Sequence, residues 1–280
     1  MAWLDALGNA RRTAPTAGST ALVSILILVF AGHAGGAPSP DPGSETGYHD
    51  VTCAPADPPR AALVYLHAGS FIVGGTDPWL RKRCEPFARA GYLTTAVDYP
   101  IAELAPDAAR FSYRRTLRHV IRAVSCLART GLPVFAYGES AGGNLAEMLA
   151  VRDRIEGSVA VAAPANLLAW ARGNRRYWRL LGMSRADRRS ASPLFRIGQH
   201  PRPLLLLHSP SDDIVPFEQS RRLARTLPDT RLIRLSRGHL EDPGAVRIGL
   251  RWFGRRTAGR KPPLSTPPGP ACRASEAAPV

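Results

Sequence analysis

Between residues 48 and 255 the chain alternates between two patterns of hydrophobic and polar positions. Short apolar runs predict buried strands, and longer segments with apolar residues three or four positions apart predict helices. The predicted strands are 62–67, 92–99, 133–137, 157–164, 203–209 and 230–236. The predicted helices are 109–130, 141–153, 217–227 and 243–255. Strands that alternate with helices predict an α/β fold, with a mostly parallel sheet covered by helices on both faces.

Three segments depart from this alternation. Residues 165–200 carry the aromatic residues Trp170, Tyr177 and Trp178 and predict a small insertion over the sheet. Residues 38–47 are polar and rich in Pro and Gly, which predicts a linker before a domain that spans 48–255. Residues 256–280 are basic and rich in Pro and show no apolar period, so we expect a disordered tail there.

The N-terminal residues 1–37 resemble a targeting segment. Arg11 and Arg12 precede the apolar run 21–31, and small residues follow it. This run is about half as long as the ~20 apolar residues that a membrane span needs. The order therefore predicts a secretory signal, cut between Ala34 and Ala37, and a secreted or extracytoplasmic protein. An uncleaved anchor formed by 21–31 is the alternative.

The four cysteines are compatible with export, because disulfides persist in oxidising compartments. Their spacing fits no zinc motif, and we expect no metal site. Cys53 and Cys84 flank an early strand and are expected to form a disulfide. Cys126 lies in an apolar helical stretch and is expected to be a buried thiol, whereas Cys272 lies in the tail.

A net charge of +15 raises the question of an anionic partner. The Arg residues are dispersed and do not alternate with aromatic residues as a stacking surface for nucleic acid requires, so we expect no nucleic-acid binding. The basic tail is compatible with a loose association with an anionic cell envelope. The sequence leaves the oligomeric state open.

The first candidate for chemistry is the stretch AYGESAGGN, residues 136–144. It fits the pattern Gly-x-Ser-x-Gly and lies between a predicted strand and a predicted helix. A tight turn of this kind needs small neighbours and lifts the serine hydroxyl towards the helix N-terminus, where developing negative charge is favoured. Ser140 is therefore a candidate nucleophile, which needs a base and an orienting acid.

Candidates for both partners follow later strands. Asp212 and Asp213 come after the strand 203–209, and His239 comes after the strand 230–236. The order Ser, Asp, His is the one expected for this architecture. Parallel strands bring the three segments to one edge of the sheet. The pattern alone does not choose between the two aspartates.

The loop after the first predicted strand supplies a third element of the site. Its small residues allow the main-chain N–H groups of Gly69 and Ser70, with that of Ala141, to bind an oxyanion. His67 and His208 end strands, and we expect them to brace their loops by hydrogen bonds rather than to transfer protons.

These motifs together resemble those of α/β-hydrolase carboxylesterases, including the hormone-sensitive-lipase-like and the acetyl-esterase or feruloyl-esterase-like groups. The matching stretches are HAGSF (67–71), GESAGG (138–143), DDIVP (212–216) and the Gly-His pair that ends at His239. The resemblance implies the α/β-hydrolase fold over 48–255 and a Ser140–Asp212–His239 triad. In this family the acid usually lies four positions before the proline of a Val-Pro pair, which selects Asp212 and leaves Asp213 to face solvent or to cap the next helix.

The chain departs from the family pattern in two places. Ala68 and Ser70 replace glycines of the oxyanion loop, and residues 38–48 are too few for the cap helices of the hormone-sensitive-lipase-like group. The smaller esterase groups therefore resemble the chain more closely.

The sequence thus predicts a serine carboxylesterase that acts on a small-molecule ester through an acyl-enzyme, without metal or organic cofactor. Because the insertion 165–200 is too short for a large cap, we expect short acyl groups. A serine peptidase or amidase of the same fold is the alternative. A non-catalytic binding protein on this scaffold is disfavoured, because all three triad residues are present.

Overall fold

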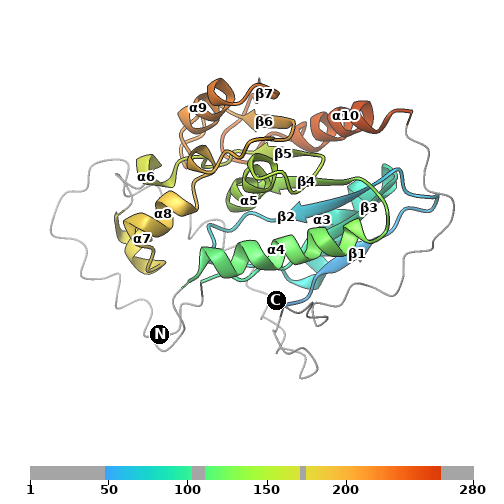
Figure 1. Ribbon diagram of the computed structural model, residues 1–280, viewed down its shortest axis with the longest axis horizontal. Helices are drawn as coiled ribbons and strands as arrows, with labels where there is room; N and C mark the ends of the chain where they lie inside the picture. The colour runs from blue at the N-terminus through green and yellow to red at the C-terminus, as the bar shows by residue number, and fades with distance from the viewer. Residues whose placement is uncertain (1–47, 103–110, 171–174, 260–280) are drawn as a thin grey trace. The chain divides into compact units, whose positions relative to one another are not determined.

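The computed structural model describes residues 48–102, 111–170 and 175–259 (Figure 1). All of them belong to one compact unit, Pro38–Val280. The predicted signal or anchor (1–37), the linker (38–47) and residues 260–280 of the predicted tail lie outside the described residues. Within the described ranges, no helix has both the length and the hydrophobicity needed to cross a membrane.

The centre of the fold is a seven-stranded sheet with the strand order β1-β3-β2-β4-β5-β6-β7 (Figure 1). Only β1 pairs in antiparallel fashion, and every other pair is parallel. The six predicted strands are all present, and β1 is the additional one, too short to show a period in the sequence. The strands are β1 Val51–Cys53, β2 Ala61–Leu66, β3 Tyr92–Val97, β4 Val134–Glu139, β5 Gly157–Val161, β6 Leu204–His208 and β7 Thr230–Arg234.

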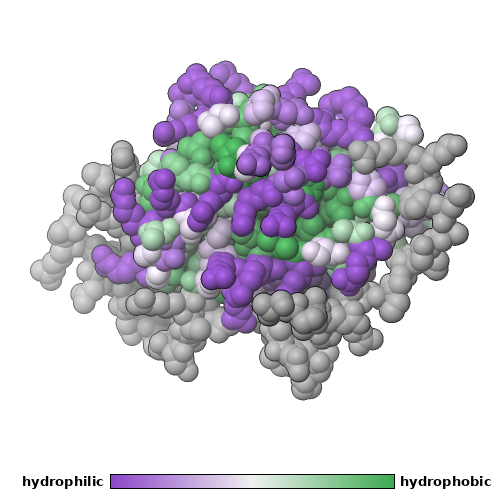
Figure 2. Space-filling view, viewed as in Figure 1, coloured by the Kyte–Doolittle hydropathy of each residue, from purple (hydrophilic) through white to green (hydrophobic). Residues whose placement is uncertain are grey.

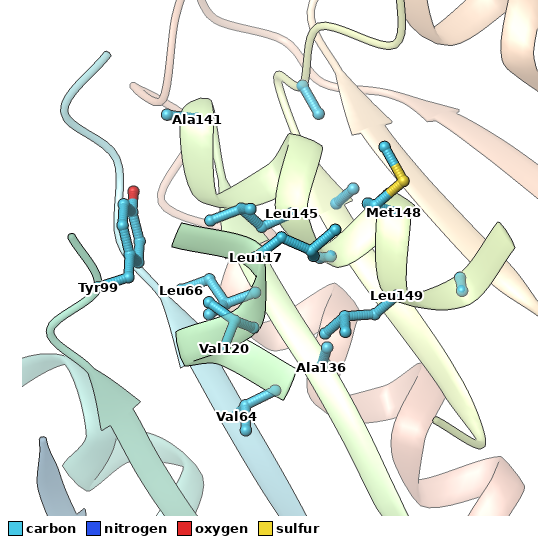
Figure 3. Packing of buried hydrophobic residues seen from close by; sticks show 14 of the residues in the cluster. Val64, Leu66, Tyr99, Leu117, Val120, Ala136, Ala141, Leu145, Met148 and Leu149 are labelled. Atoms are coloured by element: carbon cyan, nitrogen blue, oxygen red, sulfur yellow. The ribbon is translucent and has the colours of Figure 1, made fainter. Parts of the chain in front are cut away.

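Helices cover both faces of the sheet, as predicted. Along β2, Val64 and Leu66 face a core formed with α4, α5 and α9, whereas Leu63 and Tyr65 face a core formed with α3 and α10. Figure 3 shows strand residues of the first core packed against α4 and α5. The helices are α3 Asp77–Arg89, α4 Tyr113–Ala128, α5 Ala141–Val151, α9 Glu218–Thr226 and α10 Ala245–Thr257.

The surface of these helices is polar. On the face shown in Figure 2, hydrophilic side chains cover much of the helical layer, and hydrophobic surface is visible between them. The exposed side of α4 accounts for part of this polarity because it carries Arg114, Arg115, Arg118 and Arg122. The positive charge of the chain thus lies partly on the solvent side of a core helix.

The described part of the predicted insertion between β5 and β6 forms short helices. They are α6 Leu167–Trp170, α7 Arg175–Leu180, α8 Arg185–Ser190 and the 3-10 helix η2 Pro193–Phe195. At the other end of the domain, α10 continues to Thr257. The prediction that the tail begins at 256 is therefore wrong by two residues, since Arg256 and Thr257 complete the last turn of the helix.

Two predictions about cysteines have different outcomes. The predicted disulfide Cys53–Cys84 is present and joins β1 to α3. Cys126 is buried in α4, as its apolar spacing indicated, but it is disulfide-bonded, so the expected free thiol is wrong. Hydrophobic spacing predicts burial, and burial does not distinguish a thiol from a disulfide sulfur.

Candidate active site

Ser140 lies on a sharp turn between β4 and α5. Its backbone has φ 51° and ψ −111°, a strained conformation for a residue with a side chain. Two glycines make the turn possible. A Cβ on Gly138 would lie 2.1 Å from the carbonyl oxygen of Gly142, and a Cβ on Gly142 would lie 2.1 Å from that of Leu66. The Gly-x-Ser-x-Gly spacing is therefore a steric requirement of this turn.

A continuous chain of hydrogen bonds joins three of the predicted site residues. Ser140 Oγ lies 3.1 Å from His239 Nε2, and His239 Nδ1 lies 2.8 Å from Asp212 Oδ2. Because an ionised carboxylate only accepts hydrogen bonds, His239 carries its proton on Nδ1 and leaves Nε2 free to accept from the serine. The residues follow β4, β6 and β7, three parallel strands that end at one edge of the sheet.

Hydrogen bonds keep Asp212 ionised. Its Oδ1 accepts from the main-chain N–H groups of Ile214 (3.0 Å) and Val215 (2.8 Å), and its Oδ2 lies 3.1 Å from His208 Nε2 as well as next to His239. Burial alone would raise the pKa of Asp212, but the bonds from His208 and His239 outweigh it and hold this pKa well below its usual range. Asp212 is therefore a fixed negative charge beneath the imidazole.

His208 occupies the position expected of a brace for this loop. It is fully buried, and its Nδ1 lies 2.7 Å from Ser220 Oγ of α9. Its Nε2 lies between Asp212 and the carbonyl oxygen of Val215, at 2.8 Å from the latter. Asp213, the neighbouring acid, is exposed. Because α9 begins only at Glu218, Asp213 does not cap it, and the solvent-facing alternative agrees with the structure.

The predicted oxyanion loop turns through three consecutive residues with positive φ: Gly69 (134°), Ser70 (55°) and Phe71 (57°). A Cβ on Gly69 would lie 2.2 Å from the carbonyl oxygen of Val73, so this position requires glycine. Among the described residues, the main-chain N–H groups of Gly69, Ser70 and Ala141 donate no hydrogen bond to the protein. They are thus available to a ligand.

His67, the residue at the start of this loop, stabilises it through contacts of its buried ring. It is fully buried, its Nδ1 lies 2.6 Å from the carbonyl oxygen of Ala68, and its ring stacks on Tyr99 at 4.0 Å. The Tyr99 hydroxyl in turn donates to the His67 carbonyl oxygen (2.6 Å). Burial lowers the pKa of His67 to about 4, which keeps the ring neutral at neutral pH. These contacts agree with a bracing role.

The insertion contacts the loops of the site, which the sequence did not reveal. The Tyr177 hydroxyl donates to the carbonyl oxygen of Ser70 (2.6 Å), and Trp170 Nε1 donates to that of Ile214 in the acid loop (3.0 Å). Asn144, in the first turn of α5, donates to the carbonyl oxygen of Ala191 (3.1 Å). No local spacing signals these contacts, because each joins segments far apart in the chain.

Asp242 also supports the site, although its role was not predicted from the sequence. Its carboxylate accepts from the N–H and the hydroxyl of Ser236 (both 2.9 Å) and from the N–H of Gly244 (2.8 Å), so it closes the loop that carries His239. These bonds, that from the Ser236 N–H first, lower the pKa of Asp242. The Asp-Pro-Gly sequence at 242–244 is a turn signal that could have identified it.

Comparison with known families decides the classification. Residues 52–227, more than half of the chain, match the BD-FAE family model. The chain belongs to the BD-FAE family. BD-FAE domains are esterase-like α/β-hydrolases, so the predicted fold and the predicted class, carboxylesterase, are both confirmed. No curated protein sequence matches the chain.

Solved structures of esterase 2 from Thermogutta terrifontis are similar to this BD-FAE protein. The form phosphonylated by sarin is 18% identical, with a TM-score of 0.61 over 78% of this chain and 95% of that one. The native form is 21% identical, with a TM-score of 0.59 over 74% and 85%. The propionate-bound form is 21% identical, with a TM-score of 0.58 over 74% and 87%. This likeness supports the α/β-hydrolase fold.

Proposed function

We propose that this BD-FAE esterase cleaves short-acyl carboxylic esters, with Ser140 as nucleophile, His239 as general base and acid, and Asp212 as orienting acid. The observation that carries the proposal is the hydrogen-bonded chain from Ser140 Oγ through His239 to Asp212, with separations of 3.1 and 2.8 Å. A serine hydroxyl is a poor nucleophile without such a base, and the buried carboxylate stabilises the imidazolium that forms.

The reaction follows from these positions in two steps. Ser140 Oγ attacks the ester carbonyl carbon while its proton passes to His239 Nε2, and the N–H groups of Gly69, Ser70 and Ala141 bind the resulting oxyanion. His239 then gives the proton to the departing alkoxide, which leaves an acyl-enzyme. In the second step His239 takes a proton from water, the hydroxide attacks the acyl carbon, and the acid leaves as Ser140 regains its proton.

Two observations support a preference for short acyl groups. The described insertion helices contain at most six residues each, too little for a cap around a long acyl chain. In the insertion, the rings of Trp170, Tyr177 and Trp178 fill space by packing on one another at 4.7–5.7 Å. Structures of Thermogutta terrifontis esterase 2 with propionate and with butyrate bound are also among the similar structures.

The preference is tested with p-nitrophenyl esters from acetate to palmitate. We expect kcat/KM to be highest for acyl groups of two to four carbons and to fall for longer ones. The Ser140→Ala variant serves as the blank for uncatalysed hydrolysis. Aminoacyl p-nitroanilides, assayed alongside, address the peptidase or amidase alternative. A kcat/KM that rises steadily towards palmitate would contradict the short-acyl proposal, and faster cleavage of the anilides would favour the alternative.

We also propose that the enzyme is exported. The charged, apolar and small-residue order of 1–37 supports this, and the Cys53–Cys84 disulfide is of a kind that persists outside the reducing cytosol. Mass spectrometry of protein recovered from the medium or periplasm of an expressing bacterium should find a new N-terminus near residues 35–38. Recovery of full-length, membrane-bound protein alone would support the anchor instead.

A further inference from the structure

Two residues of the oxyanion loop hold a backbone conformation that glycine would adopt without strain. Ser70 and Phe71 both have a φ near +55°, in the left-handed region that side chains disfavour. Such conformations persist only where surrounding contacts hold them. The contacts that hold this loop therefore determine whether its N–H groups keep the orientation that oxyanion binding needs.

Each of three successive peptide groups in the loop is held through its carbonyl oxygen. The oxygen of Gly69 accepts from the N–H groups of Ile72 (2.9 Å) and Val73 (3.0 Å), and that of Phe71 accepts from the N–H of Ala102 (2.7 Å). These are main-chain contacts. The oxygen of Ser70, between them, accepts at 2.6 Å from the side chain of Tyr177, 107 positions later in the chain.

We propose that Tyr177 is a positioning residue for oxyanion stabilisation, and this inference rests on the proposed function. A peptide group is planar, so the bond from Tyr177 to the Ser70 oxygen fixes the plane of the peptide group between Ser70 and Phe71. It thereby fixes ψ of Ser70, the residue whose N–H is one of the proposed oxyanion donors. Without Tyr177, the group between Ser70 and Phe71 can rotate, which would move φ of Phe71 out of the left-handed region. The strain in Phe71 favours that rotation, and the tyrosine hydroxyl opposes it.

Packing within the insertion restricts the position of the Tyr177 hydroxyl. Tyr177 is partly buried, and its ring packs against Trp178 at 4.7 Å and Trp170 at 5.7 Å. Trp170 is itself bonded to the acid loop through the carbonyl oxygen of Ile214. The same aromatic cluster therefore contacts the acid loop and the oxyanion loop. A glycine at position 70 would adopt this conformation freely. In this chain the position is Ser70, and the hydrogen bond from Tyr177 holds its peptide group in place.

The test is Tyr177→Phe, which removes the hydroxyl and keeps the ring. We expect kcat/KM for p-nitrophenyl acetate to fall about 10- to 100-fold, mostly through kcat, because misplaced donors weaken transition-state binding. Affinity for a short alkyl trifluoromethyl ketone, whose serine adduct carries an oxyanion, should fall by the same factor. Acetate and butyrate esters should be affected equally, since a donor to the carbonyl oxygen does not contact the acyl chain.

The matched control is Tyr92→Phe. Tyr92 is the first residue of β3, so it lies at the N-terminal ends of the parallel strands, whereas Ser140 follows the C-terminal end of β4. The Tyr92→Phe variant should therefore keep kcat within about twofold. All variants are compared at a temperature where circular dichroism shows them equally folded. A Tyr177→Phe enzyme with wild-type kcat and ketone affinity, or one changed only in KM, would overturn the inference. Activity retained by Ser140→Ala would instead refute the proposed function.

Discussion

Ser140→Ala is expected to lower kcat on p-nitrophenyl acetate by about 10⁴- to 10⁶-fold while the protein stays folded. The substitution removes the nucleophile and leaves the Cβ, so the strained turn between Gly138 and Gly142 is unchanged. It also removes the 3.1 Å hydrogen bond between the serine hydroxyl and His239. Because triad members act as a unit, His239→Ala should cost a similar factor.

The control for Ser140→Ala is Ser158→Ala. Ser158 is buried near the start of β5, at the N-terminal ends of the parallel strands and away from Ser140. Its hydroxyl has no hydrogen-bond partner among the described residues. Its loss should leave kcat unchanged. A fluorophosphonate probe followed by peptide mass spectrometry gives an independent reading, since it should label Ser140 in the wild type and in Ser158→Ala only. Near wild-type turnover by folded Ser140→Ala would eliminate the mechanism.

The fold and the central site could be predicted because their signals are local and occur in order. Buried parallel strands are continuous apolar runs, so β2 to β6 are visible in the sequence. The glycines around Ser140 mark a turn that only small residues permit. Parallel topology then brings the ends of β4, β6 and β7 together, which places Asp212 and His239 near Ser140 without knowledge of any distance.

The remaining features depend on contacts that no local pattern encodes. Helix α3 was not predicted although Leu80, Cys84 and Phe87 have helical spacing, because charged residues and Pro86 dilute the pattern. Tyr177 stands out in the sequence only as an aromatic residue of an insertion, since its bond to Ser70 joins positions 107 residues apart. The site therefore contains residues whose roles follow from sequence motifs, such as Ser140, and residues whose roles follow only from tertiary contacts, such as Tyr177.

The choice between two adjacent acids leads to the second large expected effect. Both oxygens of Asp212 accept from N–H groups alone: Oδ1 from the amides of Ile214 and Val215, and Oδ2 from the rings of His208 and His239. An asparagine at this position would face donors with its own NH₂ group in either orientation. With NH₂ towards His239, the ring would have to move its proton to Nε2 and could no longer accept from Ser140.

Asp212→Asn is therefore expected to lower kcat about 10⁴-fold, the size of effect known when the orienting acid of a Ser-His-Asp triad becomes an amide. Asp213→Asn is the matched control, because it makes the same chemical change one residue later on an exposed side chain. It should alter kcat less than about twofold and stability by about 0.5 kcal/mol or less. Both variants are assayed with p-nitrophenyl acetate across pH, after near-ultraviolet circular dichroism has verified native packing. If Asp213→Asn proved to be the inactive variant, the acid would have been assigned one residue too early, and the 2.8 Å contact between Asp212 and His239 would not be the catalytic one.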